Sequence, residues 1–259
     1  EPLAMAKAIR VALLLFVLAT VAVGAWRKRD LIQTWERTLD VVVYPINGDG
    51  RDATAAYMAS LSSQSFVSIG EFMRNESARH GLLLANPVSV KLGPRVSSLP
   101  PSAPVRGKTP EIILWSLVMR FWAWRNDDYA GPNPDVRVFA VYFDPAARQR
   151  VEHSIGLKEG RIGIANVFAA AHMSEENNVV IAHEILHTFG ATDKYETATT
   201  QPLYPDGYAD PKQIPLYPQQ LAEIMAGRIP LSETQSETPS TLELAIVGDR
   251  TAAEIHWRR

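Results

Sequence analysis

The 259-residue sequence contains no cysteine. It therefore forms no disulfide bond and offers no thiolate ligand, so a metal site in this chain must use histidine and carboxylate side chains. The absence does not indicate a compartment, because such a chain suits a reducing or an oxidising one.

The sequence also has little net charge, with 28 acidic side chains against 26 Lys and Arg and a formal net charge of -2. That balance gives no reason to expect a nucleic-acid partner. Hydrophobic residues make up 46% and charged residues 21%, which is ordinary for a globular protein. The length suits one large domain or two small ones.

One long run is both free of charged side chains and almost entirely apolar, from Val11 to Trp26. Lys7 and Arg10 precede it, and three basic residues, 27–29, follow it. A membrane-spanning helix needs about 20 apolar residues, so the run is slightly short, although Trp and Arg at its ends suit a membrane interface. We predict that residues 1–30 form a membrane anchor. A cleaved signal peptide and a buried core helix stay open as alternatives.

The strongest candidates for metal ligands occur in the pattern H-E-x-x-H-x-x-G-x-x-D, which begins at His183 and ends at Asp193. Positions four apart lie on one face of a helix, so His183 and His187 can bind one cation. Zinc accepts such ligands, and a catalytic zinc keeps one position for water. Glu184 is placed to take a proton from that water. A buried helix that carries two histidines by chance is the alternative.

Local signals give this helix its ends. Ser174 is a good N-cap, and Glu175 and Glu176 suit the positive end of the helix dipole. Gly190 tolerates the left-handed conformation that ends a helix. The chain can then fold back and bring Asp193 to the same metal as a third ligand.

The segment resembles the zinc signature of metzincin metallopeptidases, in the variant whose third ligand is Asp. Those enzymes have a methionine-containing turn beneath the metal, and Met225 in Glu223–Arg228 fits that place. The soluble part also resembles an uncharacterised bacterial family of membrane-anchored zinc proteases. The segments 43–47, 183–195 and 208–228 carry that second resemblance.

The resemblance implies an endopeptidase with one catalytic Zn²⁺ held by His183, His187 and Asp193, and with Glu184 as general base. Its partners would be a peptide or protein substrate and the membrane. It further implies that the strand just before the zinc helix lies at the sheet edge and pairs with extended substrate. That role would fall to Gly163, Ile164, Ala165, Asn166 and Val167, with a plain structural hairpin as the alternative.

An N-terminal anchor ahead of a hydrolase more often exports the domain, which favours a single-pass protein of the bacterial inner membrane with the catalytic domain on the periplasmic or extracellular side. A strict count of flanking basic residues would instead favour a cytoplasmic domain. The sequence does not determine the oligomeric state.

Other interpretations of the site stay open. Glu196 or Glu223 could replace Asp193 as third ligand, or the chain could be a membrane-tethered, non-catalytic zinc-binding or scaffold domain. A structural zinc normally closes all four positions with protein ligands, which argues against that scaffold. Four more residues are candidates for supporting roles: Tyr195, Tyr217, His153 and His172.

The remaining pattern predicts an α/β (α+β) domain with a metzincin-like mixed sheet, a backing helix and the zinc helix packed on it. We expect a domain of residues 31–259, with an upper part of about 31–190 and a small irregular lower part of about 191–259. The predicted strands are Leu39–Ile46, Val88–Leu92, Val136–Phe143 and Gly160–Phe168. A long helix is predicted over Ala53–His80 and a short one over Ala252–Trp257. Ile112–Trp124 is predicted as a buried helix or strand, with a membrane-leaning surface as the alternative.

Overall fold

A computed structural model describes residues 15, 34–104, 109–151, 154–157 and 161–258. The predicted anchor therefore lies outside the described residues, apart from Leu15. Among the residues that are described, no helix combines the length and the apolar character needed to cross a bilayer.

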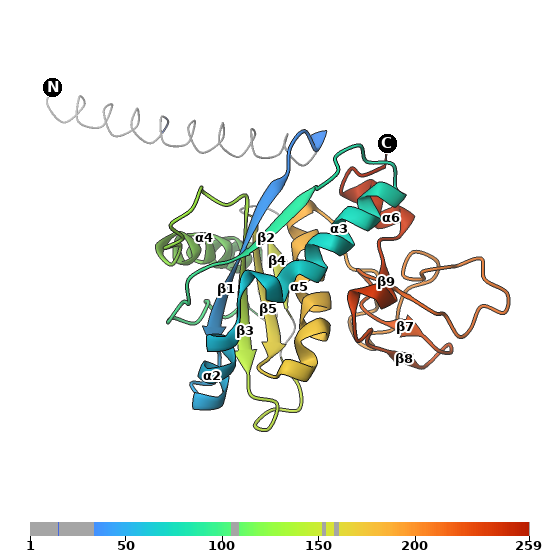
Figure 1. Ribbon diagram of the computed structural model, residues 1–259. Helices are drawn as coiled ribbons and strands as arrows, with labels where there is room; N and C mark the ends of the chain where they lie inside the picture. The colour runs from blue at the N-terminus through green and yellow to red at the C-terminus, as the bar shows by residue number, and fades with distance from the viewer. Residues whose placement is uncertain (1–14, 16–33, 105–108, 152–153, 158–160, 259) are drawn as a thin grey trace, which may run out of the picture.

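The predicted mixed α/β architecture is confirmed, and its centre is a five-stranded sheet in the order β2-β1-β3-β5-β4 (Figure 1). Neighbouring strands run parallel except β4, which pairs antiparallel with β5. The strands are β1 (Leu39–Asn47), β2 (Val88–Leu92), β3 (Val136–Phe143), β4 (Ile155–Leu157) and β5 (Ile162–Phe168).

Both faces of the sheet are covered, as a mostly parallel sheet requires. The period-2 alternation of strand side chains divides the core into two clusters. Leu39, Val41 and Val43 of β1 join the cluster that contains α3 (Val67–Arg79) and α5 (Ser174–Phe189). Val42 and Tyr44 face the opposite side, where α4 (Thr109–Arg125) packs.

The long helix predicted over Ala53–His80 is divided into three pieces. The pieces are α2 (Asp52–Ser60), the 3-10 helix η1 (Ser63–Phe66) and α3. Leu61 is extended, and Ser62 and Ser65 form a capping box that starts η1. The hydrophobic spacing was continuous, but the serine side chains capture backbone groups that an unbroken helix would need.

The chain after α5 is mostly irregular. Its regular pieces are β6 (Ala222–Glu223), β7 (Ile229–Pro230), β8 (Ser236–Glu237), η3 (Leu242–Leu244), β9 (Ala245–Ile246) and α6 (Asp249–Glu254). This C-terminal segment packs on the core that contains α3 and α5, where Ile224, Met225 and Val247 are fully buried. It thereby provides a wall beside the face of α5 that carries the histidines.

Candidate metal centre

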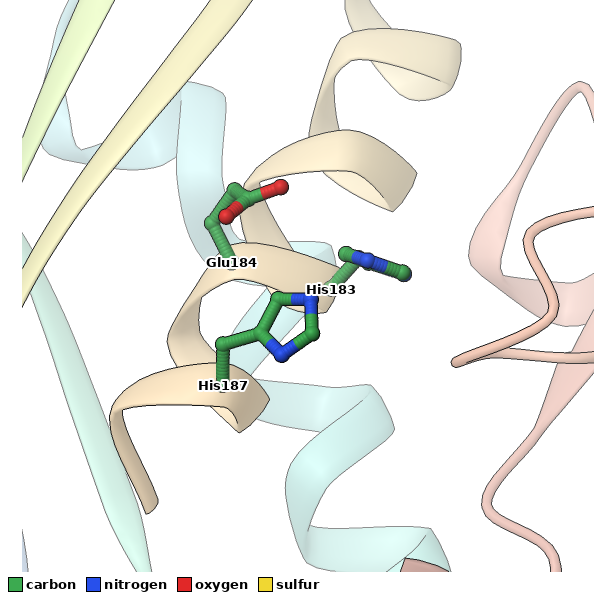
Figure 2. A group of neighbouring side chains, drawn as sticks. All are labelled: His183, Glu184 and His187. Carbon is green, nitrogen blue, oxygen red and sulfur yellow. The ribbon is translucent and has the colours of Figure 1, made fainter. Parts of the chain in front are cut away.

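Two turns of α5 carry the candidate site. The helix begins at Ser174 itself, directly after η2 (Ala171–Met173). Ser174 was predicted as the N-cap, but Met173 occupies that position. The helix ends at Phe189 because Gly190 adopts a φ of 111°, as predicted. Figure 2 shows the side chains of His183, Glu184 and His187 projecting from consecutive turns of this helix.

The structure brings Asp193 to both histidines. Its Oδ1 lies 3.2 Å from Nε2 of His183 and 3.1 Å from Nε2 of His187. Tetrahedral zinc with ligands at about 2.0–2.2 Å requires neighbouring ligand atoms to lie roughly 3.2–3.6 Å apart. The two separations between Asp193 and the histidines are therefore close to those of neighbouring ligands on one tetrahedral ion.

Backbone carbonyls fix which nitrogen of each ring points to Asp193. Nδ1 of His183 lies 2.9 Å from the Ile224 carbonyl oxygen, and Nδ1 of His187 lies 2.9 Å from that of Ala191. A carbonyl only accepts, so Nδ1 carries the proton in both neutral rings. Nε2 is then left with the lone pair that a metal ligand requires.

Glu184 is 2% exposed, and its Oε2 is among the buried polar atoms of the described chain that have no hydrogen-bond partner. Burial raises the pKa of Glu184 to about 7, against the opposing pull of His183 and His187. A group with that pKa can both accept and return a proton near neutral pH. The carboxylate lies with the two histidines in a group whose candidate ligand atoms are all within 4.8 Å of one another.

The charged groups of the cluster shift one another's pKa values. Burial would lower the pKa of His183, but the hydrogen bond from its Nε2 to Asp193 and the charge of Glu184 raise it to about 9, so an ion that binds this nitrogen would have to displace its proton. Burial would raise the pKa of Asp193, yet the hydrogen bonds from His183 and His187 hold it far below its ordinary value. The ionised carboxylate and two imidazoles form a donor set that suits a divalent ion.

Met225 lies in a tight turn next to the histidines and is fully buried. The turn is closed by a hydrogen bond from the Ala226 N–H to the Glu223 carbonyl oxygen, 2.9 Å long. The neighbouring Ile224 holds His183, and the Met225 carbonyl oxygen accepts the N–H of Lys194 at 2.9 Å. The turn therefore connects the first histidine to the segment that carries Asp193.

The two glutamates considered as alternative third ligands have other partners. Glu223 is fully buried, and its carboxylate accepts hydrogen bonds from three backbone N–H groups and from the hydroxyl of Thr251. Glu196 is exposed and accepts the hydroxyl of Thr199 at 2.6 Å. Among these three carboxylates, Asp193 is the one that the structure places on both histidines.

The predicted substrate strand lies next to the edge strand of the described sheet, and its residues Gly163 and Ile164 are paired on the outer side. Residues Gly163 to Val167 lie in β5, and β4 pairs with Ile162–Ile164 on its outer side. The edge position belongs to β4, whose three residues gave too short a pattern to be recognised. A Cβ on Gly156 of β4 would come within 2.2 Å of the His187 Cβ, so β4 lies directly against the site.

The other candidates for supporting roles occupy different places. Tyr195 is near the site, because the charges of Asp193 and Glu184 add to burial in raising its pKa to about 12. Tyr217 shares a 2.7 Å hydrogen bond with the hydroxyl of Tyr208. His172 is exposed in η2, and His153 lies outside the described residues.

The sequence analysis missed the two carbonyls that orient the histidines and a salt bridge behind Asp193. Lys194 Nζ lies 2.8 Å from Oε2 of Glu254, and their side chains are 5% and 15% exposed. A histidine that binds metal commonly donates its second N–H to an acceptor, so such partners are expected in general. The sequence does not reveal the pairings of His183 with Ile224 and of Lys194 with Glu254, which join residues 41 and 60 positions apart.

Comparison with known proteins gives little further information. No protein-family model matches the chain, and no curated protein matches it. A solved structure described as "Structure of a chaperone-substrate complex" is similar to it with a TM-score of 0.38 and 11% sequence identity. That similarity covers 85% of this chain and 33% of the other, so the chain spans about one third of that structure, and a likeness at this level carries no argument about function.

Proposed function

We propose that this protein is a zinc-dependent endopeptidase of metzincin-like fold that uses the site on α5. The observation that carries the proposal is the placement of Asp193 Oδ1 within 3.2 Å of both histidine Nε2 atoms, beside a buried carboxylate oxygen of Glu184 without a partner. A closed structural zinc site would need a fourth protein ligand and would give Glu184 no task.

His183, His187 and Asp193 would hold the ion, which when bound lowers the pKa of a coordinated water and polarises the scissile carbonyl. Glu184 takes the proton of the attacking water and delivers it to the leaving amine. Its burial suits both steps, because a pKa near 7 balances proton uptake against proton release.

Extended peptide substrate would reach the site along the edge of the sheet. β4 ends the described strand order and lies against His187 through Gly156. The proposal therefore assigns main-chain pairing with substrate to β4 and no longer to the predicted residues of β5. The membrane anchor and the periplasmic or extracellular position remain part of the proposal and depend on residues 1–30.

The test is Glu184→Gln measured beside Glu175→Gln, which removes an exposed carboxylate from the first turn of the same helix. Loss of the general base should lower the rate of peptide hydrolysis about 10²–10⁴-fold. Zinc content, measured by atomic absorption, should stay near one ion per chain in both variants. The parent and Glu175→Gln should cleave a mixed peptide library and stop when a chelator is added.

Retained cleavage in Glu184→Gln would remove Glu184 from the proposed role. A parent chain that binds zinc stoichiometrically but cleaves nothing in the library, with or without added zinc, would favour the non-catalytic zinc-binding domain.

A further inference from the structure

The outward side of α4 is an apolar surface on the sheet face opposite the candidate metal centre. Seven of its large apolar side chains are between 45% and 72% exposed: Ile112, Ile113, Leu114, Leu117, Val118, Phe121 and Trp124. The solvent side of a helix that packs on a sheet is normally polar. Contiguous exposed apolar surface of this kind indicates an interaction site.

Packing on the sheet does not explain this surface, because α4 already has a separate buried side. Met119 and Ala123 are 0% and 1% exposed and belong to the core cluster beneath the helix. The indoles of Trp115 and Trp122 donate 3.0 Å hydrogen bonds to the Pro101 carbonyl and the Ser98 hydroxyl. The helix is therefore fixed in place with its second apolar side turned outward.

The substrate of the proposed peptidase would not cover this surface. The histidines project from α5, which packs on the other face of the sheet with α3, whereas α4 lies on the opposite side (Figure 1). A different partner must therefore account for it.

We propose that the outward side of α4 rests in the interfacial region of a lipid bilayer. The chain itself supplies the first argument, since Val11 to Trp26 is a long apolar run without charges and basic residues flank it. If that run enters a bilayer, the chain from Trp26 to Thr34 spans at most about 28 Å. The described domain is then held close to a lipid surface, and an apolar helix side of about 26 Å length can reach it.

The charges of α4 provide the second argument. Arg125 is the exposed cation of the last turn of α4, whereas Arg120 is half-buried with its Nε buried, and the acidic residues Glu111, Asp127 and Asp128 lie at the two ends of the apolar stretch. Arginine stems lie along apolar surface while their guanidinium groups reach anionic headgroups, and aromatic residues such as Trp124 favour the same depth.

The absence of cysteine from the sequence makes the test simple, because one introduced cysteine gives one labelled position. Leu117→Cys and Phe121→Cys place an environment-sensitive fluorophore on α4. The matched controls are Leu83→Cys and Ile214→Cys, apolar positions away from α4 that are 99% and 95% exposed. The full chain of each variant is reconstituted in vesicles of zwitterionic and anionic lipid, with and without spin-labelled lipid.

The expected result is blue-shifted emission at positions 117 and 121 that spin-labelled lipid strongly quenches, with water-like, unquenched emission at 83 and 214. Water-like emission at 117 and 121 would overturn the proposal. Blue-shifted emission that lipid does not quench would also overturn it, because a second copy or the chain's own apolar run would then cover α4. Equal quenching at all four positions would show non-specific insertion and would likewise refute it.

Discussion

The salt bridge between Lys194 and Glu254 should control both the stability of the domain and its affinity for metal. Glu254 on α6 accepts hydrogen bonds from the Thr192 N–H and hydroxyl and from Lys194 Nζ, at 2.8–3.0 Å. These are the two neighbours of Asp193 in the chain. Glu254 thereby fixes the segment on both sides of the third candidate ligand.

Glu254→Gln keeps the size of the side chain but leaves the ammonium group of Lys194 without its counterion. Lys194 is buried, with 4% of the residue exposed. Breaking one partner of a buried ion pair costs about 3–5 kcal/mol. For a domain of this size, 1 kcal/mol lowers the melting temperature by about 2–4 °C, so the expected fall is roughly 6–20 °C. Zinc affinity should fall as well, because the Asp193 carboxylate is less firmly held.

The matched control is Arg250→Gln. Arg250 Nε lies 3.2 Å from the same glutamate, but its side chain is 63% exposed, so its loss should cost only about 0–1 kcal/mol. Both variants are followed by thermal melting and by zinc titration against a competing chelator. The combined variant Lys194→Met with Glu254→Gln should recover part of the loss, because no buried charge is then left unpaired.

The pH dependence has a definite sign. Burial would raise the pKa of Glu254, but its bonds to Lys194 and Thr192 hold it below the ordinary value. Its stabilising contribution is therefore present above the pKa of an unfolded glutamate, about 4.3, and is lost as the pH falls through the lower folded value. The gap between the parent and Glu254→Gln should shrink below that pH. Equal melting temperatures for Glu254→Gln and Arg250→Gln at neutral pH would refute the reasoning.

Three further variants test the site. Asp193→Ala should lose zinc affinity in the same titration with little change in fold, and unchanged zinc content would return the third-ligand role to a glutamate. Gly156→Ala should lower the free energy of unfolding by about 1–3 kcal/mol and reduce zinc binding, because its Cβ would come within 2.2 Å of the His187 Cβ. The control is Gly163→Ala, whose Cβ would meet the Glu184 Cβ at 3.4 Å, and its melting temperature should change little. Glu223→Gln should cost about 3 kcal/mol in chemical denaturation, because an amide nitrogen cannot accept the bonds that the carboxylate accepts, and a neutral result would show that this network is dispensable.

The positions of the wrong predictions are informative. The helix predicted over residues 53–80 was interrupted by a local serine cap that hydrophobic spacing does not register. β4 was missed because three residues carry too little periodicity, and its place at the sheet edge depends on pairing with β5. Ile112–Trp124 was expected to be buried, but only one side of α4 packs on the sheet.

The sequence by itself determined what is local: the strands of the parallel sheet, the helix that carries His183, Glu184 and His187, and the glycine that ends it. Spacing along one helix places two imidazoles on one face whatever surrounds them. Tertiary structure decided the rest, namely the carbonyls of Ile224 and Ala191 that orient the rings, the buried Lys194–Glu254 pair behind Asp193, and the exposed side of α4. Apart from the local contact between His187 and Ala191, those features depend on contacts between segments far apart in the sequence, which local patterns do not reveal.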